Sequence, residues 1–264
     1  MKNEEAKHDY TIVTELPGAR GSREQIARLY ARYGFASEFC KNKDVLEVAC
    51  GAGIGLGYLA KHARTVVGGD IDENNLRYAR EVCKGRINID IRELDAQDLP
   101  YGNGTFDVVI LYEAIYYLPK PTKFVLEARR ILKNGGIILI CTTNRDWSGF
   151  NPSPYSHTYF SAPELFELLR SASFKTVLYG GCPTRASTLK DKIISVIKSG
   201  AVKLCLIPKT MKGKEILKRV FMGKLTPLPP EIQDDMVEYE PPIPIDPIHP
   251  NSDYKVLFAV GYVA

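Results

Sequence analysis

The sequence predicts a doubly wound α/β fold with a sheet of seven strands. Short β-branched runs alternate with helical patterns between Val45 and Ala264, which is typical of a parallel sheet covered by helices. One strand leads into a glycine-rich turn at residues 45–55, and acidic residues follow the next two strands. Together these observations predict one sheet with polar side chains at successive strand ends.

Composition and charge narrow the class of protein. The chain has 264 residues, of which 45% are hydrophobic and 25% charged, so it can bury one sizeable core. Its net charge of +4 does not by itself imply a nucleic acid partner. The six cysteines show no C-x-x-C spacing and no histidine at metal-ligand spacing, which predicts reduced core residues and no metal site. A charged N-terminus and the lack of a long apolar run lead us to expect a cytoplasmic protein.

Periodicity assigns the elements in order. Residues 23–39 read as a helix that Ser22 can cap, and Ser161 with Glu164 forms a capping-box pattern before another helix. Strands are expected at 44–48, 65–69, 87–91, 106–111, 136–142, 174–179 and 254–260, with further helices at 55–62, 74–84 and 121–133.

The same pattern divides the chain into four parts. Residues 1–42 form an N-terminal cap with one helix, and 43–180 form the core. Residues 181–251 interrupt the alternation between the last two strands, and 252–264 supply the last strand. In this insertion, 185–224 is basic with helical spacing, whereas 225–250 is rich in proline and acidic residues and is expected to be extended. We expect the N-terminal helix and the insertion to enclose the site, with the insertion packed against its mouth.

The most informative stretch is the glycine-rich turn, Ala49-Cys50-Gly51-Ala52-Gly53, which follows the strand containing Glu47. Glycines there let the backbone approach a ligand closely at the start of a helix. A dinucleotide pattern G-x-G-x-x-G from Gly51 or Gly53 fails, because Leu56 and Tyr58 occupy the third glycine position. Carboxylates then recur in register, with Asp70 ending the second strand and Asp95 following the third.

From about Lys43 to Phe174 the chain resembles the class I S-adenosylmethionine-dependent methyltransferases, especially the small-molecule branch with ubiquinone and menaquinone biosynthesis enzymes. That resemblance implies a Rossmann-like sheet whose last strand is antiparallel, and S-adenosylmethionine as cofactor. The motifs that carry it are Glu47-x-Ala49-Cys50-Gly51-Ala52-Gly53, Asp70, Asp95-Ala96, Phe106-Asp107-Val108-Val109 and Arg130-Ile131-Leu132-Lys133-Asn134-Gly135-Gly136.

The resemblance also implies roles for single residues. Glu47 would orient the turn and the methionine amino group, Asp70 would hold the ribose, and Ile71 would lie against the adenine. Asp95 and the amide of Ala96 would meet the adenine edge, with Tyr112 nearby. The turn itself would lie under the methionine and ribose, and Ala49, where glycine is common, is acceptable if its φ is negative. The cofactor site is thus expected at Glu47, Ala49, Cys50, Gly51, Gly53, Asp70, Ile71, Asp95, Ala96 and Tyr112.

Methyl transfer mainly requires alignment of the reacting atoms, and a base only where the acceptor must lose a proton. His157 is the first candidate, since imidazole titrates near neutrality, and Glu113 is the second. Either residue can equally be structural. Aromatic residues Tyr116, Tyr117, Trp147 and Tyr155 are expected to wall an acceptor pocket.

The acceptor is left open as a small metabolite, a sugar or a carrier-linked molecule, methylated on oxygen, carbon or nitrogen. The basic segment 185–224 reads as a solvated lid, as a site for an anionic acceptor, or as a peripheral membrane contact. No DNA partner is expected, because Asn151-Pro152-Ser153-Pro154-Tyr155 lies away from the strand end where an amino-methyltransferase motif belongs. A nicotinamide-dependent oxidoreductase and a non-catalytic cofactor-binding protein remain as alternatives.

Overall fold

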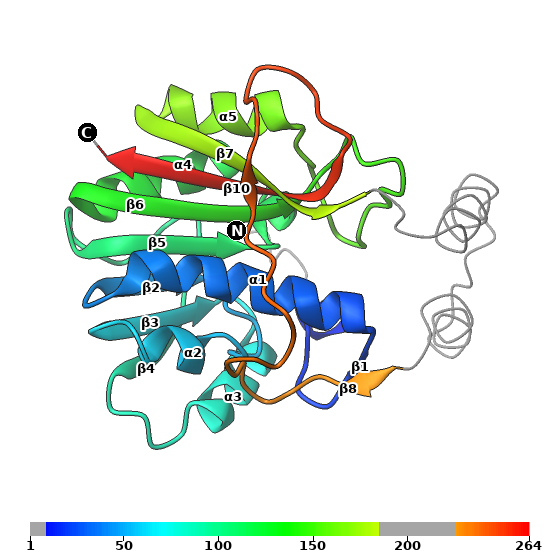
Figure 1. Ribbon diagram of the computed structural model, residues 1–264. Coiled ribbons are helices and arrows are strands. Elements are labelled where there is room, and N and C mark those ends of the chain that lie inside the picture. The colour runs from blue at the N-terminus through cyan, green and yellow to red at the C-terminus, as the bar shows by residue number, and fades with distance from the viewer. Residues whose placement is uncertain (1–8, 185–224, 264) are drawn as a thin grey trace, which may run out of the picture.

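A computed structural model describes residues 9–184 and 225–263, which form one twisted sheet with helices on both faces (Figure 1). The order of strands is β4-β3-β2-β5-β6-β10-β7-β9, and β10 runs antiparallel to both β6 and β7. The predicted doubly wound sheet with an antiparallel last strand is therefore confirmed, although within the described residues it has eight strands rather than seven, because the short β9 pairs with β7 at its edge. The strands of this sheet are β2 (Asp44–Val48), β3 (Thr65–Asp70), β4 (Ile89–Glu93), β5 (Phe106–Tyr112), β6 (Leu132–Thr143), β7 (Phe174–Pro183), β9 (Ile243–Pro244) and β10 (Tyr254–Val263).

Two hydrophobic cores lie on the two faces of the sheet. One packs α4 and α5 against the sheet around Phe124, Ile131 and Leu165, and the other packs α1 and α2 around Leu29 and Leu59. The helices are α1 (Arg23–Cys40), α2 (Leu56–Ala60), α3 (Glu73–Val82), α4 (Pro121–Ile131) and α5 (Ala162–Ser171), with single turns η1 (Tyr10–Ile12) and η2 (Ile115–Tyr117). None of the helices in the described ranges has the length and apolar character needed to cross a bilayer.

The predicted helix caps are present. The Ser22 hydroxyl accepts the N–H of Gln25, whose side chain returns to the Ser22 N–H, so α1 begins with a full capping box. Ser161 and Glu164 do the same for α5. Each cap therefore determines the first residue of its helix, Arg23 in α1 and Ala162 in α5.

Element boundaries differ from the predicted ones at several places. Strand β4 is shifted two residues later than expected, and β6 begins at Leu132 because this residue pairs with Phe106 across a bulge. Helix α4 therefore ends at Ile131 rather than at Lys133. Strand β7 continues to Pro183, into the part of the chain assigned to the insertion.

Residues 225–251 of the insertion run across the outside of α1 and α2 (Figure 1). It contributes β8 (Thr226–Pro227), which pairs with β1 (Arg20–Gly21), and β9 at the edge of the main sheet. The Tyr239 ring fills the space above Gly34 of α1, and its hydroxyl donates to Glu38 at 3.1 Å. This segment therefore fastens α1 to the sheet, while residues 185–224 lie outside the described ranges.

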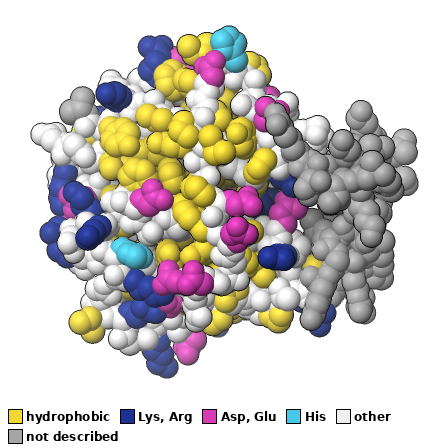
Figure 2. All heavy atoms as spheres, in the orientation of Figure 1, with side chains coloured by type: hydrophobic (Ala, Val, Ile, Leu, Met, Phe, Trp, Pro, Cys, Tyr) yellow, Lys and Arg dark blue, Asp and Glu magenta, His cyan; other side chains and the backbone are white. Residues whose placement is uncertain are grey.

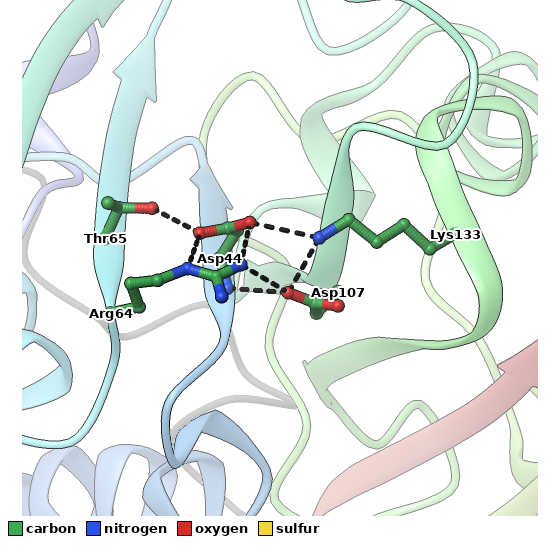
Figure 3. Close-up of polar contacts among 5 residues, drawn as sticks. All are labelled: Asp44, Arg64, Thr65, Asp107 and Lys133. Atoms are coloured by element: carbon green, nitrogen blue, oxygen red, sulfur yellow. Dashed lines mark hydrogen bonds and ion pairs between the residues drawn. The ribbon is translucent and has the colours of Figure 1, made fainter.

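A charged cluster ties together the amino ends of four neighbouring strands (Figure 3). Asp44 accepts from Arg64 Nε at 2.8 Å, from the Thr65 hydroxyl at 2.9 Å and from Lys133 Nζ at 3.0 Å. Asp107 accepts the Asp44 N–H at 2.8 Å and shares Lys133 at 3.0 Å. Hydrogen bonding by Arg64 lowers the pKa of Asp44. Burial raises the pKa of Asp107, but the Asp44 N–H and Lys133 outweigh it and the net shift is downward.

Asp107→Asn should lower the free energy of unfolding at pH 7 by about 1–2 kcal/mol, because Lys133 and the Asp44 N–H lose a charged acceptor. Since both carboxyls have lowered pKa values in the fold, their stabilisation is complete above about pH 4 and is lost as the pH falls through the lowered values. The variant should therefore also lose less stability than the wild type below about pH 4. Urea denaturation at pH 7 and pH 3 measures both effects.

Glu167→Gln is the control, because Glu167 forms an exposed pair with Arg170 on α5. Equal losses in the two variants at pH 7 would contradict a structural role for the cluster.

Candidate functional site

A cavity of about 520 Å³ opens at the carboxyl ends of the central parallel strands, the end of the sheet opposite the charged cluster. That volume is within the range of small-molecule sites, and the place is where open α/β sheets bind ligands. Its wall comes from the N-terminal segment, α1, the glycine-rich turn and the ends of β3 to β6. The residues used below that line it are Tyr10, Thr14, Glu15, Arg28, Arg32, Ala49, Cys50, Gly51, Asp70, Ile71, Asp95, Ala96, Tyr112, Glu113, Tyr116, Tyr117 and Thr143.

The turn after β2 adopts left-handed backbone at alternate residues, with φ of 55° at Ala49, 55° at Gly51 and 75° at Gly53. A Cβ on Gly51 would lie 2.9 Å from the Thr14 methyl, so glycine is also required for space. The Gly51 N–H donates to Asp70 at 2.9 Å, which ties the turn to the end of β3. The tight turn that the sequence predicts after this strand is therefore confirmed.

Ala49 departs from the expectation of a negative φ. Its φ of 55° is a conformation that costs a non-glycine residue about 1–2 kcal/mol. The neighbouring Cys50 N–H donates to the Gly69 carbonyl at 2.9 Å, which holds the turn in this shape. The alanine is thus tolerated because the surrounding hydrogen bonds fix the backbone.

Asp70 is buried at the end of β3 and accepts two backbone N–H groups, from Gly51 and from Asp72, both at 2.9 Å. The Asn75 side chain approaches one of its oxygens at 3.5 Å. Burial raises the pKa of Asp70, although these donors oppose the shift. A carboxylate has about four acceptor positions, so both oxygens retain capacity for the hydroxyl groups of a ligand.

The expected adenine-side residues lie around the same part of the cavity. Asp95, Ala96 and Ile71 all line it, and Ile71 is 45% exposed. An exposed apolar side chain at a cavity wall is suited to contact the flat face of a ring. Asp95 also accepts the Gln97 N–H at 2.8 Å, which fixes the loop that presents it.

Glu47 lies behind the turn rather than in the cavity wall. Its side chain is buried, and one oxygen accepts the Tyr33 hydroxyl at 2.6 Å. The other oxygen, Oε2, is buried without a hydrogen-bond partner in the described part of the protein. Burial raises the pKa of Glu47 to about 7, against the opposing effects of Tyr33 and Arg32. A buried polar atom without a partner is rare in folded proteins, so this oxygen marks Glu47 as an unusual residue next to the turn.

Glu113 lines the cavity directly after β5. Its backbone is left-handed, with φ of 51°, and its N–H donates to the Cys141 carbonyl at 2.8 Å. The carboxylate accepts hydroxyls of Tyr116 and Thr143, both at 3.1 Å, and Arg28 at 3.4 Å. These contacts hold the side chain in one position at the wall.

The aromatic residues expected around the acceptor divide into two groups. Tyr116 and Tyr117 line the cavity, and Tyr117 contacts the Tyr10 ring at 5.7 Å. Tyr155 is beyond Tyr10, at 6.2 Å between rings, and is not part of the lining. Trp147 lies under the Lys255 ammonium at 5.6 Å and is also away from the cavity.

His157, the first candidate base, has an exposed side chain outside the lining of the cavity, and its backbone N–H donates to the Tyr116 carbonyl at 2.7 Å. Gly53 likewise does not reach the lining, because it packs on Ala79 of α3. The structure thus gathers most of the expected cofactor residues and Glu113, but not His157. The catalytic role of His157 stays a prediction from sequence.

Sequence reasoning assigned residues 1–42 to an N-terminal cap but named none of its residues as lining the cavity. Tyr10, Thr14 and Glu15 come from a segment with no helical or strand pattern. Arg28 and Arg32 come from α1, where their spacing of four places both on the inner face. This spacing was the one signal in the sequence for these residues. Side chains four positions apart on a helix lie on the same face, so two arginines at this spacing can point together toward a neighbouring site.

The insertion differs from the expectation in its described part. Residues 225–250 supply none of the residues that line the cavity, because they lie on the outer side of α1. The part of the expectation that concerns 185–224 falls outside the described residues.

Comparison with known proteins identifies the domain. Residues 46–140 match a family model described as a methyltransferase domain. The chain is 32% identical over 166 residues to a probable S-adenosylmethionine-dependent methyltransferase of Mycolicibacterium smegmatis, covering 61% of this chain and 63% of that protein. It is 30% identical over 124 residues to a ubiquinone biosynthesis O-methyltransferase of Mesorhizobium japonicum, covering 47% and 50%. The chain thus spans only about half to three fifths of these relatives.

Solved structures agree in fold. A methyltransferase from Thermotoga maritima, described as a possible histamine N-methyltransferase, matches with a TM-score of 0.58 at 15% identity, over 91% of this chain and 92% of the other. A putative methyltransferase from Bacillus halodurans matches with a TM-score of 0.55 at 17% identity, over 90% and 98%. Residues 46–140 therefore match a methyltransferase domain, in line with the motifs, and the relatives include S-adenosylmethionine-dependent methyltransferases.

Ala49→Gly should raise the free energy of unfolding by up to about 1 kcal/mol. Relief of the left-handed strain outweighs the greater entropy of glycine in the unfolded chain. Ala52→Gly is the matched control in the same turn. Ala52 is buried and has no positive φ, so this variant should lose about 1 kcal/mol. Urea denaturation compares the two, and a loss in both would contradict the strain at Ala49.

Proposed function

We propose that this protein binds S-adenosylmethionine in the cavity and transfers its methyl group to a small or carrier-linked acceptor. The observation that carries the proposal is the set of carboxylates around one glycine-rich turn. Asp70 and Asp95 line the cavity beside it, and Glu47 lies behind it with an unpartnered oxygen. The motifs shared with methyltransferases fall on these same positions.

The residues fit the cofactor. Asp70 has acceptor capacity for two ribose hydroxyls, and Ile71, Asp95 and Ala96 form the side suited to an adenine ring. Glu47 is buried behind the tight turn at Gly51 and outside the lining of the cavity, which fits the expected role of orienting the turn. When bound, S-adenosylmethionine supplies a methyl group already activated on a sulfonium.

The protein has mainly to position the acceptor and exclude water. The N-terminal segment covers the site through Tyr10, whose N–H donates to Asp72 at 2.8 Å. Glu113 presents a fixed carboxylate to the acceptor side and is the candidate there for orienting a donor or taking a proton. Tyr116 and Tyr117 supply aromatic wall on the same side.

The acceptor is a small metabolite, a sugar or a carrier-linked molecule, methylated on oxygen, carbon or nitrogen. An anionic acceptor or a peripheral membrane contact rests on the basic residues of 185–224, so these two hypotheses depend on sequence alone. No DNA partner is proposed.

Calorimetric titration with S-adenosylmethionine, S-adenosylhomocysteine and NADH tests the cofactor. Micromolar binding of both adenosyl ligands and none of NADH is the expected result. Binding of NADH alone would favour an oxidoreductase and contradict the proposal. Transfer of a labelled methyl group to anionic sugars or isoprenoids then tests catalysis. Binding without transfer to any acceptor would favour the non-catalytic alternative.

Asp70→Asn should weaken S-adenosylhomocysteine binding more than tenfold, because charge-assisted hydrogen bonds to hydroxyl groups are lost. Asp90→Asn is the matched control, since Asp90 lies on β4 in an exposed pair with Arg92. Calorimetry on both variants checks the effect. An unchanged affinity in Asp70→Asn would remove Asp70 from the ribose site.

A further inference from the structure

The side of the sheet that carries α1 is only partly covered where β6, β10 and β7 lie together. Phe35 of α1 packs on Phe258 and Tyr179 there, with ring centroids 5.4 Å and 5.2 Å apart. From Tyr179 toward the start of β7, no helix of the described chain crosses these three strands on this side (Figure 1). This part of the sheet therefore has a surface of its own.

Apolar side chains make up this surface. Because side chains alternate along a strand, Val177 lies on the same side of β7 as Tyr179. Strand pairing places Tyr262 of β10 beside Ile137 of β6. We call the partly exposed residues of this surface the apolar face: Phe39, Ile137, Val177, Tyr179 and Tyr262. Figure 2 shows hydrophobic side chains gathered over these strands, above α1 in the view. A continuous apolar surface of this kind is typical of an interaction site.

Prolines protect the edge of the sheet beside the apolar face. Strand β9 pairs with β7 at Gly180, and Pro241, Pro242 and Pro244 in and before β9 have no N–H to donate. An edge without these donors resists the addition of another strand. A partner at this place therefore contacts the side chains of the apolar face and does not extend the sheet.

Charges of opposite sign border the apolar face. Lys175 is exposed at the start of β7, on the same side of the strand as Val177. Glu238 and Glu240 are exposed at the other border, where the chain passes from α1 to β9. None of these three charges forms an ion pair with a residue of 9–184 or 225–263. From Lys175 to Gly180, where β9 pairs, β7 spans roughly 17 Å, so the basic and acidic borders lie on opposite sides of the apolar face.

Such a surface is complementary to a second copy of itself. In a two-fold dimer the same patch of both copies meets, and every contact between two different residues occurs twice. A two-fold axis in the plane of the apolar face, at right angles to β7, brings Lys175 of one copy to Glu238 and Glu240 of the other. A partner that carries charges of one sign would leave one of the two borders unpaired.

We propose that the apolar face is a dimer interface, at which two copies of this chain pack through a two-fold axis. The inference does not depend on the proposed function, since none of the five residues of the apolar face lines the cavity. Association removes apolar surface of both copies from water, which supplies the affinity. The contacts of Lys175 with Glu238 and Glu240 select the orientation of the two copies.

Sedimentation velocity of the full chain measures the association. A dimer with a Kd of about 50 μM or tighter is the expected result, and a wild-type protein that is monomeric at about 100 μM would overturn the proposal and leave this face to another occupant. Val177→Asp should weaken dimerisation at least about tenfold, because a charge would be buried against apolar side chains. Ile87→Asp is the matched control, since Ile87 is fully exposed just before β4 at the far edge of the sheet, and its Kd should stay within about twofold of the wild type.

Charge reversal tests the orientation of the two copies. Lys175→Glu and Glu240→Lys should each weaken dimerisation about fivefold, because like charges then meet across the interface, and the double variant should return to within about threefold of the wild type. Thermal unfolding checks that each variant is folded. If Val177→Asp is not, the charge reversals decide, since Lys175 and Glu240 are exposed. An unchanged dimer in a folded Val177→Asp would overturn the proposal, as would single charge reversals without effect or a double variant without recovery.

Discussion

The hydrogen bond from the Gly51 N–H to the Asp70 carboxylate fixes the shape of the cavity. It joins the turn after β2 to the end of β3, so the two strands present one continuous surface. Asp70 accepts the Asp72 N–H as well, and Asp72 in turn accepts the Tyr10 N–H of the covering segment. The floor and the cover of the cavity are thus linked through two carboxylates at one strand end.

Helix α1 also determines the shape of the cavity, because one of its sides packs against the rest of the protein and the other lines the cavity. Its outer side packs against residues 225–251, where Tyr239 lies on Gly34 and the Asp235 N–H approaches the Tyr30 hydroxyl at 3.4 Å. Its inner side supplies Arg28 and Arg32 to the cavity. The remote segment therefore positions site residues that it does not touch, since a helix moves as a rigid rod. Figure 2 shows the face of the molecule over which this segment runs, where hydrophobic side chains gather between charged ones.

Much of the fold could be predicted because its signals are local. Alternation of strands and helices, capping boxes and the glycine-rich turn each lie within about ten residues of sequence. The end of α4 was misplaced, since the pairing of Leu132 with Phe106 is a contact between distant residues. The φ of Ala49 was missed for a similar reason, as hydrogen bonds to β3 determine it.

The carboxylates that line the cavity could be predicted from their places at strand ends, whereas the lining residues of the covering segment could not. The Tyr10 N–H donates to Asp72, which lies 62 residues away in the sequence. The residues around Tyr10 give no indication of this contact. His157 was chosen for its chemistry alone, and residue type does not say which way a loop side chain points. The exposed position of His157 illustrates this limit.

Charges in the cavity wall form pairs that differ in how firmly the carboxylate is held. Glu113 accepts two hydroxyl donors besides Arg28, so its side chain has one fixed position at the wall. Glu15 instead comes from the covering segment and its side chain is 38% exposed, whereas the side chain of its partner Arg32 is 9% exposed. The second pair therefore joins a largely desolvated cation to a carboxylate that remains in contact with water, so the attachment of the covering segment to α1 depends on a less firmly held group than the contact between α1 and the end of β5.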